Sequence, residues 1–216
     1  NETKLIGTLF KPRQKAIAGY GTHAEAIQEN VLHSLVGRAA ETEWGKIYDY
    51  KHIGNYQDFQ RVPVQTYEDI KGYVDRMRHG EKNVLWPGRV RWYAKSSGTT
   101  NDKSKFIPVT PAGLQKVHYS GGFDTIATYV ANNPSSRIFS GKALILGGSH
   151  SPNYNLQNSL VGDLSSILIE NCSPFVNMMR VPKKEIALLS DFEEKMERIA
   201  RTTFDKNVTN LSGVPS

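Results

Sequence analysis

A short apolar run, Lys142–Leu146, ends at Gly147-Gly148 and has helical patterning on both sides. Apolar runs of this length that end at glycine are typical of strands buried on both faces. A second β-forming stretch, Val208–Leu211, follows a further helical segment. A strand, then helices, then a strand is the order that produces a parallel sheet. The sequence therefore predicts an α/β fold, a parallel or mixed sheet with flanking helices.

Helices are predicted where apolar residues recur at helical spacing after a recognisable start signal. The first is expected to begin at Thr22, where Glu25 would complete a capping box, and residues 10–21 before it are expected to be irregular. Loop residues are expected between the helices. The predicted helices cover residues 22–45, 66–80, 110–132, 156–171 and 191–205.

Two short β-forming stretches enclose a polar segment in the middle of the chain. They are Val90–Ala94 and Phe106–Val109, and residues 95–105 lie between them. Pro108 has no amide hydrogen, so the second strand is expected near a sheet edge or a bulge. The pattern predicts a hairpin with a polar connection.

The connection reads KSSGTTNDKSK and combines small hydroxyl side chains with lysines. Phosphate oxygens bind to closely spaced short donors, and Gly98 lets the backbone approach a ligand. A polar surface turn has the same composition, so the residues alone leave both interpretations open. The chain contains neither the Walker A spacing nor the dinucleotide fingerprint. The donors available to a phosphate are Ser96, Ser97, Gly98, Thr99, Thr100, Lys95, Lys103 and Lys105.

Charge and composition restrict the class of protein. The net charge of +6 over 216 residues fits an anionic ligand, and the 27 lysines and arginines are scattered, which argues against a nucleic-acid tail. Cys172 is the single cysteine, so an internal disulfide and a cysteine-based metal site are excluded. A reducing, cytoplasmic location is the simplest expectation. No apolar run reaches membrane-spanning length, and no signal peptide is expected.

Two other candidate sites are weaker. The six histidines lack the spacing of a zinc site. Gly147–His150 places a serine beside a histidine but lacks the spacing of a nucleophile elbow, so we interpret it as a loop after a strand. No catalytic residue and no metal ligand is predicted in this chain.

The residues Ser96–Thr100, followed by Lys105 and Phe-Ile-Pro, resemble the phosphate-binding motif of the adenylate-forming superfamily. The flanking strings Thr42–Lys46, Tyr67–Ile70 and Ser212–Ser216 are similar to segments of the auxin-responsive promoter (Gretchen Hagen three) family of acyl acid amido synthetases. The resemblance runs from about residue 22 to the end of the chain. It implies the N-terminal portion of an adenylate-forming enzyme fold.

The resemblance implies an ATP-dependent ligase. A carboxylic acid would attack the α-phosphate of ATP with Mg²⁺ present, pyrophosphate would leave, and an amine such as an amino acid would attack the acyl-adenylate. The loop would bind the phosphates as an electrostatic clamp and would not act as a nucleophile. The expected partners are these small substrates and the missing C-terminal region of the same polypeptide, with no nucleic acid and no membrane. The implied ATP-binding residues are Ser96, Ser97, Gly98, Thr99, Thr100 and Lys105.

Family members are more than twice as long as this chain. The chain is therefore expected to be the N-terminal part of the large adenylation domain, with residues 1–88 mainly helical and residues 89–216 α/β, and to be inactive alone. It departs from the family pattern at Asp102, where Gly is usual, and at Ser104, which is often Pro; an acidic side chain weakens attraction for phosphate. One alternative is a non-catalytic nucleotide- or anion-binding regulatory module. A second is a basic surface that binds nucleic acid.

Overall fold

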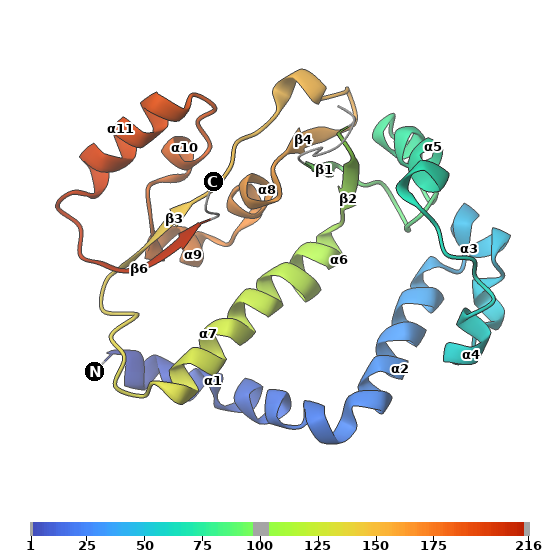
Figure 1. The fold of residues 1–216 in the computed structure, drawn as a ribbon, viewed down its shortest axis with the longest axis horizontal. Helices are drawn as coiled ribbons and strands as arrows, with labels where there is room; N and C mark the ends of the chain where they lie inside the picture. Colours follow the sequence, from blue (N-terminus) through green and yellow to red (C-terminus); the bar gives the residue numbers. More distant parts are fainter. Residues whose placement is uncertain (1, 97–103, 214–216) are drawn as a thin grey trace. The chain divides into compact units, whose positions relative to one another are not determined.

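The computed structural model describes residues 2–96 and 104–213 (Figure 1). The chain divides into two compact units. The first unit is assembled from three stretches of the chain, Asn1–Ile17, Pro111–Asn153 and Val161–Ser216. The second comprises Ala18–Thr110 and Tyr154–Leu160. The chain therefore leaves the first unit early, builds most of the second, and then returns.

Both units begin with helices. The prediction that residues 10–21 are irregular is wrong, because α1 (Glu2–Ala18) and the start of α2 occupy them and only Gly19 separates the two helices. Thr22 does not cap the helix as predicted, since its hydroxyl donates to the Gly19 carbonyl. A break remains nearby, at the non-helical His23. The helices of the second unit are α2 (Tyr20–Ala39), α3 (Glu43–Ile47), the 3-10 helix η1 (Tyr50–His52), α4 (Tyr56–Phe59) and α5 (Tyr67–Arg78).

A tight corner joins α2 to α3. The buried Thr42 hydroxyl accepts the Gly45 amide and donates to the Ala39 carbonyl. A Cβ atom on Gly45 would stand 2.0 Å from that carbonyl oxygen, so only glycine fits here. Trp44 then packs against the rings of Tyr48 and Tyr73, at centroid distances of 4.7 and 5.3 Å.

The predicted hairpin is confirmed. β1 (Trp92–Lys95) pairs antiparallel with β2 (Phe106–Val109), and Lys95 stands opposite Phe106. The sheet order is β2-β1-β4, so β2 is an edge strand, as Pro108 predicts.

The predicted helix over residues 156–171 is correct only in its second half. β4 (Leu160–Gly162) precedes α8 (Leu164–Asn171), and the Leu160 amide donates to the Arg91 carbonyl at 2.8 Å. Asp163 takes an extended conformation at the helix start. Backbone pairing with the neighbouring strand therefore replaces the helical turn that the leucine spacing indicates.

The first unit contains the predicted parallel sheet. Its order is β5-β3-β6, with β3 (Lys142–Leu146) parallel to both β5 (Arg180–Val181) and β6 (Val208–Gly213), and Figure 1 shows β3 and β6 side by side. The mixed α/β class predicted from the sequence is thus confirmed. The accompanying helices, besides α8, are α9 (Pro174–Met179), α10 (Lys184–Ala187) and α11 (Phe192–Thr203).

The helix predicted over residues 110–132 is also present. It consists of α6 (Pro111–Gly113), a π-helical stretch η2 (Leu114–Tyr119) and α7 (Ser120–Asn132). α1 lies against α7 (Figure 1), where the Phe10 and Phe123 rings are 4.6 Å apart and Arg13 pairs with Asp124 at 2.5 Å. Phe10 is buried by this contact.

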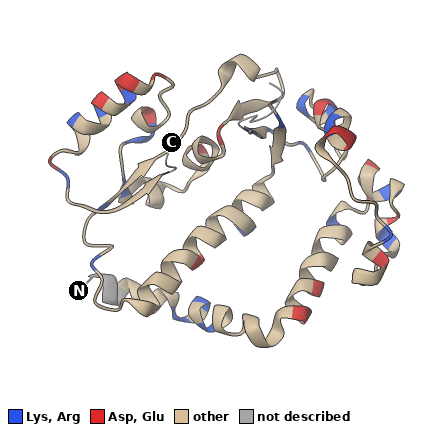
Figure 2. Ribbon diagram, in the orientation of Figure 1, with Lys and Arg blue, Asp and Glu red and all other residues tan. Residues whose placement is uncertain are grey.

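Positions of basic and acidic residues are interspersed along the helices (Figure 2). On α11, for example, Glu194 pairs with Arg198 and Glu197 with Arg201, each four residues apart. Such exposed pairs contribute little to stability. Within the described part of the chain, no helix combines the length and the apolar character needed to span a bilayer.

Candidate phosphate-binding hairpin

Two of the six predicted phosphate-binding residues are described, and the structure brings them together at the open end of the hairpin. The Ser96 amide donates to the Lys105 carbonyl at 3.0 Å, and the Lys105 amide donates to Ser96 Oγ at 3.3 Å. The other four lie outside the described residues, and their roles stay predictions: Ser97, Gly98, Thr99 and Thr100.

The hairpin register sets the direction of the two lysines. Lys95 stands opposite Phe106 and the next position, Ser96, stands opposite Lys105. Successive positions of a strand point to opposite faces, so the Lys95 and Lys105 side chains leave the hairpin on opposite faces.

Each lysine lies against a tyrosine ring. The Lys95 Nζ atom is 4.5 Å from the ring centroid of Tyr154, and the Lys105 Nζ atom is 5.7 Å from that of Tyr67. These are cation–π distances. No salt bridge among the described residues includes Lys95 or Lys105.

Tyr67 is placed by the start of α5. The Asp69 carboxylate accepts the amide and the hydroxyl of Thr66, both at 2.7 Å, which confirms the predicted helix start. These bonds also lower the pKa of Asp69, with the Thr66 hydroxyl as the larger cause. From this fixed position the Tyr67 hydroxyl accepts the Phe106 amide at 2.9 Å.

Arg78, at the other end of α5, holds the same strand residue from a second direction. Its guanidinium carbon lies 3.8 Å from the ring centroid of Phe106, and its Nη2 atom donates to the Tyr154 carbonyl at 2.7 Å. Phe106 and Tyr154 are themselves in ring contact at 5.8 Å. Arg78 is buried, with 9% of its surface exposed, so it acts on the hairpin through packing.

This arrangement suits the binding of an anion. Lys95 and Lys105 flank a segment whose sequence is rich in hydroxyl donors, and α5 fixes the first residue of β2 through the Phe106 amide. The described contacts of the hairpin are suited to electrostatic binding of an anion. The sequence does not indicate the contacts of Tyr67, Arg78 and Tyr154 with the hairpin, because they join segments far apart in the chain.

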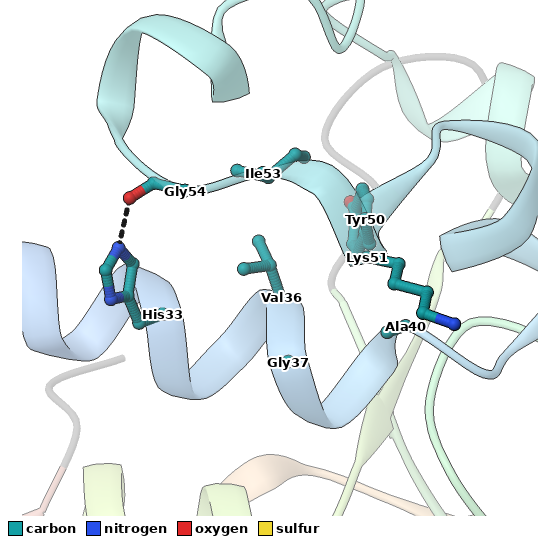
Figure 3. Close-up of a pocket in the computed structure, with 8 residues that line it drawn as sticks. All are labelled: His33, Val36, Gly37, Ala40, Tyr50, Lys51, Ile53 and Gly54. Atoms are coloured by element: carbon teal, nitrogen blue, oxygen red, sulfur yellow. Dashed lines mark hydrogen bonds between the residues drawn. The ribbon is translucent and has the colours of Figure 1, made fainter.

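A groove lies elsewhere in the second unit, between α2 and η1 (Figure 3). Its volume is about 450 Å³, and it contains none of the predicted phosphate-binding residues. The His33 Nε2 atom donates to the Gly54 carbonyl at 2.5 Å, so this nitrogen carries the proton and already has its partner. The groove is lined by His33, Val36, Gly37, Ala40, Tyr50, Lys51, Ile53 and Gly54.

The segment after β3 is a loop, as its spacing predicts, and it is held by three side chains. Ser165 Oγ accepts the Gly148 amide, and Asp163 Oδ2 accepts the Ser149 amide. Lys195 Nζ donates to the carbonyl of Gly147 at 2.7 Å and to that of Gly148 at 3.1 Å. Burial lowers the pKa of Lys195, and attraction to Asp163 opposes this shift. The burial of Lys195 could not be predicted from the sequence, because its neighbours in the helix are charged and indicate a solvent-exposed face.

A metal ion is implied only by the family resemblance. Across residues 2–96 and 104–213, no group of three or more His, Cys, Asp or Glu side chains is placed to hold one.

The fold matches solved structures of acyl acid amido synthetases. A GH3.15 acyl acid amido synthetase aligns over 84% of this chain and 32% of its own, with a TM-score of 0.67 and 24% identity. AtGH3.15 acyl acid amido synthetase in complex with 2,4-DB aligns over 88% of this chain and 33% of its own, with a TM-score of 0.69 and 23% identity. This chain thus shares the fold of about a third of each of these structures.

The chain belongs to the GH3 family, since the model of the GH3 family N-terminal domain matches residues 13–214. Indole-3-acetic acid-amido synthetase GH3.15 of Arabidopsis thaliana is 35% identical over 101 residues, 46% of this chain and 17% of that protein. Indole-3-acetic acid-amido synthetase GH3.17 of the same plant is 28% identical over 135 residues, 61% of this chain and 22% of that protein. The chain thus spans about a fifth of the length of these relatives, and the predicted family is confirmed.

Proposed function

We propose that this chain is the N-terminal portion of an ATP-dependent ligase that adenylates a carboxylic acid and transfers the acyl group to an amine. Its relatives in the GH3 family carry the names of amido synthetases and of a 4-substituted benzoates-glutamate ligase. The proposed substrates are accordingly a small carboxylic acid and an amine such as an amino acid.

The observation that carries the proposal is the hairpin stem. Ser96 and Lys105 are joined by two hydrogen bonds, so both ends of the Ser/Thr/Gly loop start from one fixed point. We assign binding of the ATP phosphates to this loop. Its hydroxyls and amides, with the Lys105 ammonium, would bind the β- and γ-phosphates and stabilise the departing pyrophosphate. The residues of this assignment are Ser96, Ser97, Gly98, Thr99, Thr100 and Lys105.

The proposal gives the chain no nucleophile. The carboxylate of the acid would attack the α-phosphate, and the bond to pyrophosphate would break. The amine would then attack the acyl carbon and release AMP. The protein's part is positioning and charge stabilisation, which account for large rate effects in acyl and phosphoryl transfer. Mg²⁺ belongs to the proposal as a companion of ATP, and no step is assigned to it here.

The test uses the full-length polypeptide. A panel of carboxylic acids is screened for pyrophosphate release in the presence of ATP and Mg²⁺, and the stimulating acid is then used with Thr99→Ala. We expect at least one acid to stimulate release and the variant to release pyrophosphate more slowly. If no acid stimulates release, the ligase proposal fails. If Thr99→Ala works as well as the wild type, the assignment of the loop fails.

The alternative is a regulatory module that binds a nucleotide or anion without catalysis. The same screen separates the two, because the module would bind ATP while no acid would trigger pyrophosphate release.

Cytoplasmic location remains part of the proposal, in line with the single cysteine.

A further inference from the structure

We propose that Tyr67 is a positioning residue for the phosphate groups of the ligand: it fixes the second strand of the hairpin and holds Lys105 in place with its charge available. This inference rests on the proposed function of the loop. It concerns a residue outside the loop, and it follows from two contacts made by one side chain.

The first contact fixes the backbone. β2 is an edge strand, and its first residue, Phe106, turns its amide away from β1. The Lys105 amide and carbonyl, one position earlier, are bonded inward to Ser96. The Tyr67 hydroxyl accepts the outward amide at 2.9 Å. The point where the loop enters β2 is thus bonded on both sides.

The second contact orients the cation. The Lys105 ammonium lies 5.7 Å from the ring centroid of the same tyrosine, and Lys105 is exposed. A carboxylate in this place would neutralise the charge and occupy the N–H donors. A ring attracts the cation and leaves its charge and donors for phosphate oxygens. It also limits the rotamers of a long side chain, which lowers the entropy lost on binding.

α5 makes both contacts rigid. Tyr67 is its first residue, fixed by the Thr66–Asp69 capping bonds, and Arg78 is its last. The two are 11 residues apart, about three turns, so they lie on one face of the helix. Tyr67 binds the backbone of Phe106, and Arg78 covers its ring at 3.8 Å. One helix face therefore holds the strand residue that adjoins Lys105.

The experiment measures kcat and KM for ATP in the full-length protein with a stimulating acid. Tyr67→Leu removes both contacts, and Tyr67→Phe removes only the hydroxyl. We expect Tyr67→Leu to raise KM for ATP about 3- to 10-fold, with Tyr67→Phe between it and the wild type. KM for the acid should stay unchanged. The matched control is Tyr56→Phe, because Tyr56 is 61% exposed on α4, and it should behave as wild type.

A double-mutant cycle with Lys105→Met separates positioning from general destabilisation. If Tyr67 acts through Lys105, Tyr67→Leu should have little further effect on KM in the Lys105→Met background. Fully additive effects, or equal increases in KM for ATP and for the acid, would overturn the inference.

A second measurement keeps the inference separate from the proposed function. Binding of inorganic tripolyphosphate to the full-length protein is followed by titration calorimetry, which needs no turnover. If no acid stimulates pyrophosphate release but Tyr67→Leu still weakens tripolyphosphate binding, the ligase proposal fails and the positioning role stands. If Tyr67→Leu binds tripolyphosphate as tightly as the wild type, or the wild type binds none, the positioning role fails.

Discussion

Thr42 shows how one buried hydroxyl can fix the corner between two helices. It is 1% exposed, accepts the Gly45 amide at 3.0 Å and donates to the Ala39 carbonyl at 2.6 Å. Thr42→Ala leaves a buried amide without its acceptor, so we expect the free energy of unfolding to fall by about 1–2 kcal/mol. Denaturant unfolding followed by tryptophan fluorescence measures this, because the three tryptophans all lie in the second unit. Thr42→Ser should retain most of the stability, and an equal loss in both variants would contradict the hydrogen-bond explanation.

Lys195 plays the corresponding role in the first unit. It is 7% exposed and donates to two carbonyls of the loop after β3. Lys195→Met keeps the length of the side chain and removes the donor, so we expect a loss of about 1–3 kcal/mol and faster amide hydrogen exchange at Gly148 and Ser149. Mass spectrometry of exchanged peptides would show it. Lys206→Met, at an exposed position, serves as the control; if both variants exchange alike, Lys195 does not hold the loop.

At the scale of the element, α5 ends in a group of charges that predicts a pH dependence. Arg76 donates to the carboxylates of Glu43 and Glu81, and these bonds are the largest cause of the lowered pKa of each acid. The resulting stabilisation is present above the unfolded pKa of 4.5 and is lost as the pH falls through the lower folded values. Arg76→Gln should therefore be less stable than wild type at neutral pH, and the difference should shrink on acidification.

Unfolding followed by tryptophan fluorescence between neutral pH and about pH 3 measures this difference across the window. Arg89→Gln is the matched control, since the Arg89 guanidinium is bonded to the Asn158 amide oxygen and to no carboxylate among the described residues. Its stability relative to wild type should not vary with pH. A constant gap between Arg76→Gln and wild type would refute the role of the ion pairs.

Elements with strong local signals could be predicted from the sequence. β2 and β3 lie where their residues predict them. Short β-forming runs bounded by polar or glycine residues are too short for a helix and favour a strand. α11 begins after Asp191, whose side chain accepts the Glu194 amide as the spacing indicates. In these cases the local preference and the tertiary contacts agree.

Elements that depend on distant contacts could not be predicted. β4 exists because Leu160 pairs with Arg91, far earlier in the chain, and its leucine spacing indicates a helix. α1 is a continuous helix through Pro12, and the ring of Phe10 packs against that of Phe123 on α7. In both cases the deciding contact is made by a segment far away in the sequence.

In the molecule as a whole, the candidate site also combines a part that the sequence indicates with a part that depends on distant contacts. The sequence indicates the donor-rich loop, and the structure adds Tyr67 and Arg78, which come from α5 to meet Phe106. Their local sequence indicates a helix but not these contacts with Phe106. The GH3 relatives extend well beyond the region matched here, since the chain spans 17% of the length of one and 22% of another.

The isolated 216-residue chain is expected to lack catalysis. If the substrates bind partly outside this region, the hairpin alone cannot bring the acid to the α-phosphate. Acid-dependent exchange between ATP and labelled pyrophosphate is the suitable assay, with the full-length protein as the positive control. Exchange by the isolated chain above the level without acid would contradict this expectation.

Lysine labelling tests directly whether ATP contacts the hairpin. Lysines of the full-length protein are acetylated briefly with and without ATP and Mg²⁺, and the modified positions are quantified by mass spectrometry. Lys105 and Lys82 are both exposed, but only Lys105 lies at the loop. We expect ATP to protect Lys105 from acetylation and to leave the labelling of Lys82 unchanged. Equal labelling of Lys105 with and without saturating ATP would contradict it.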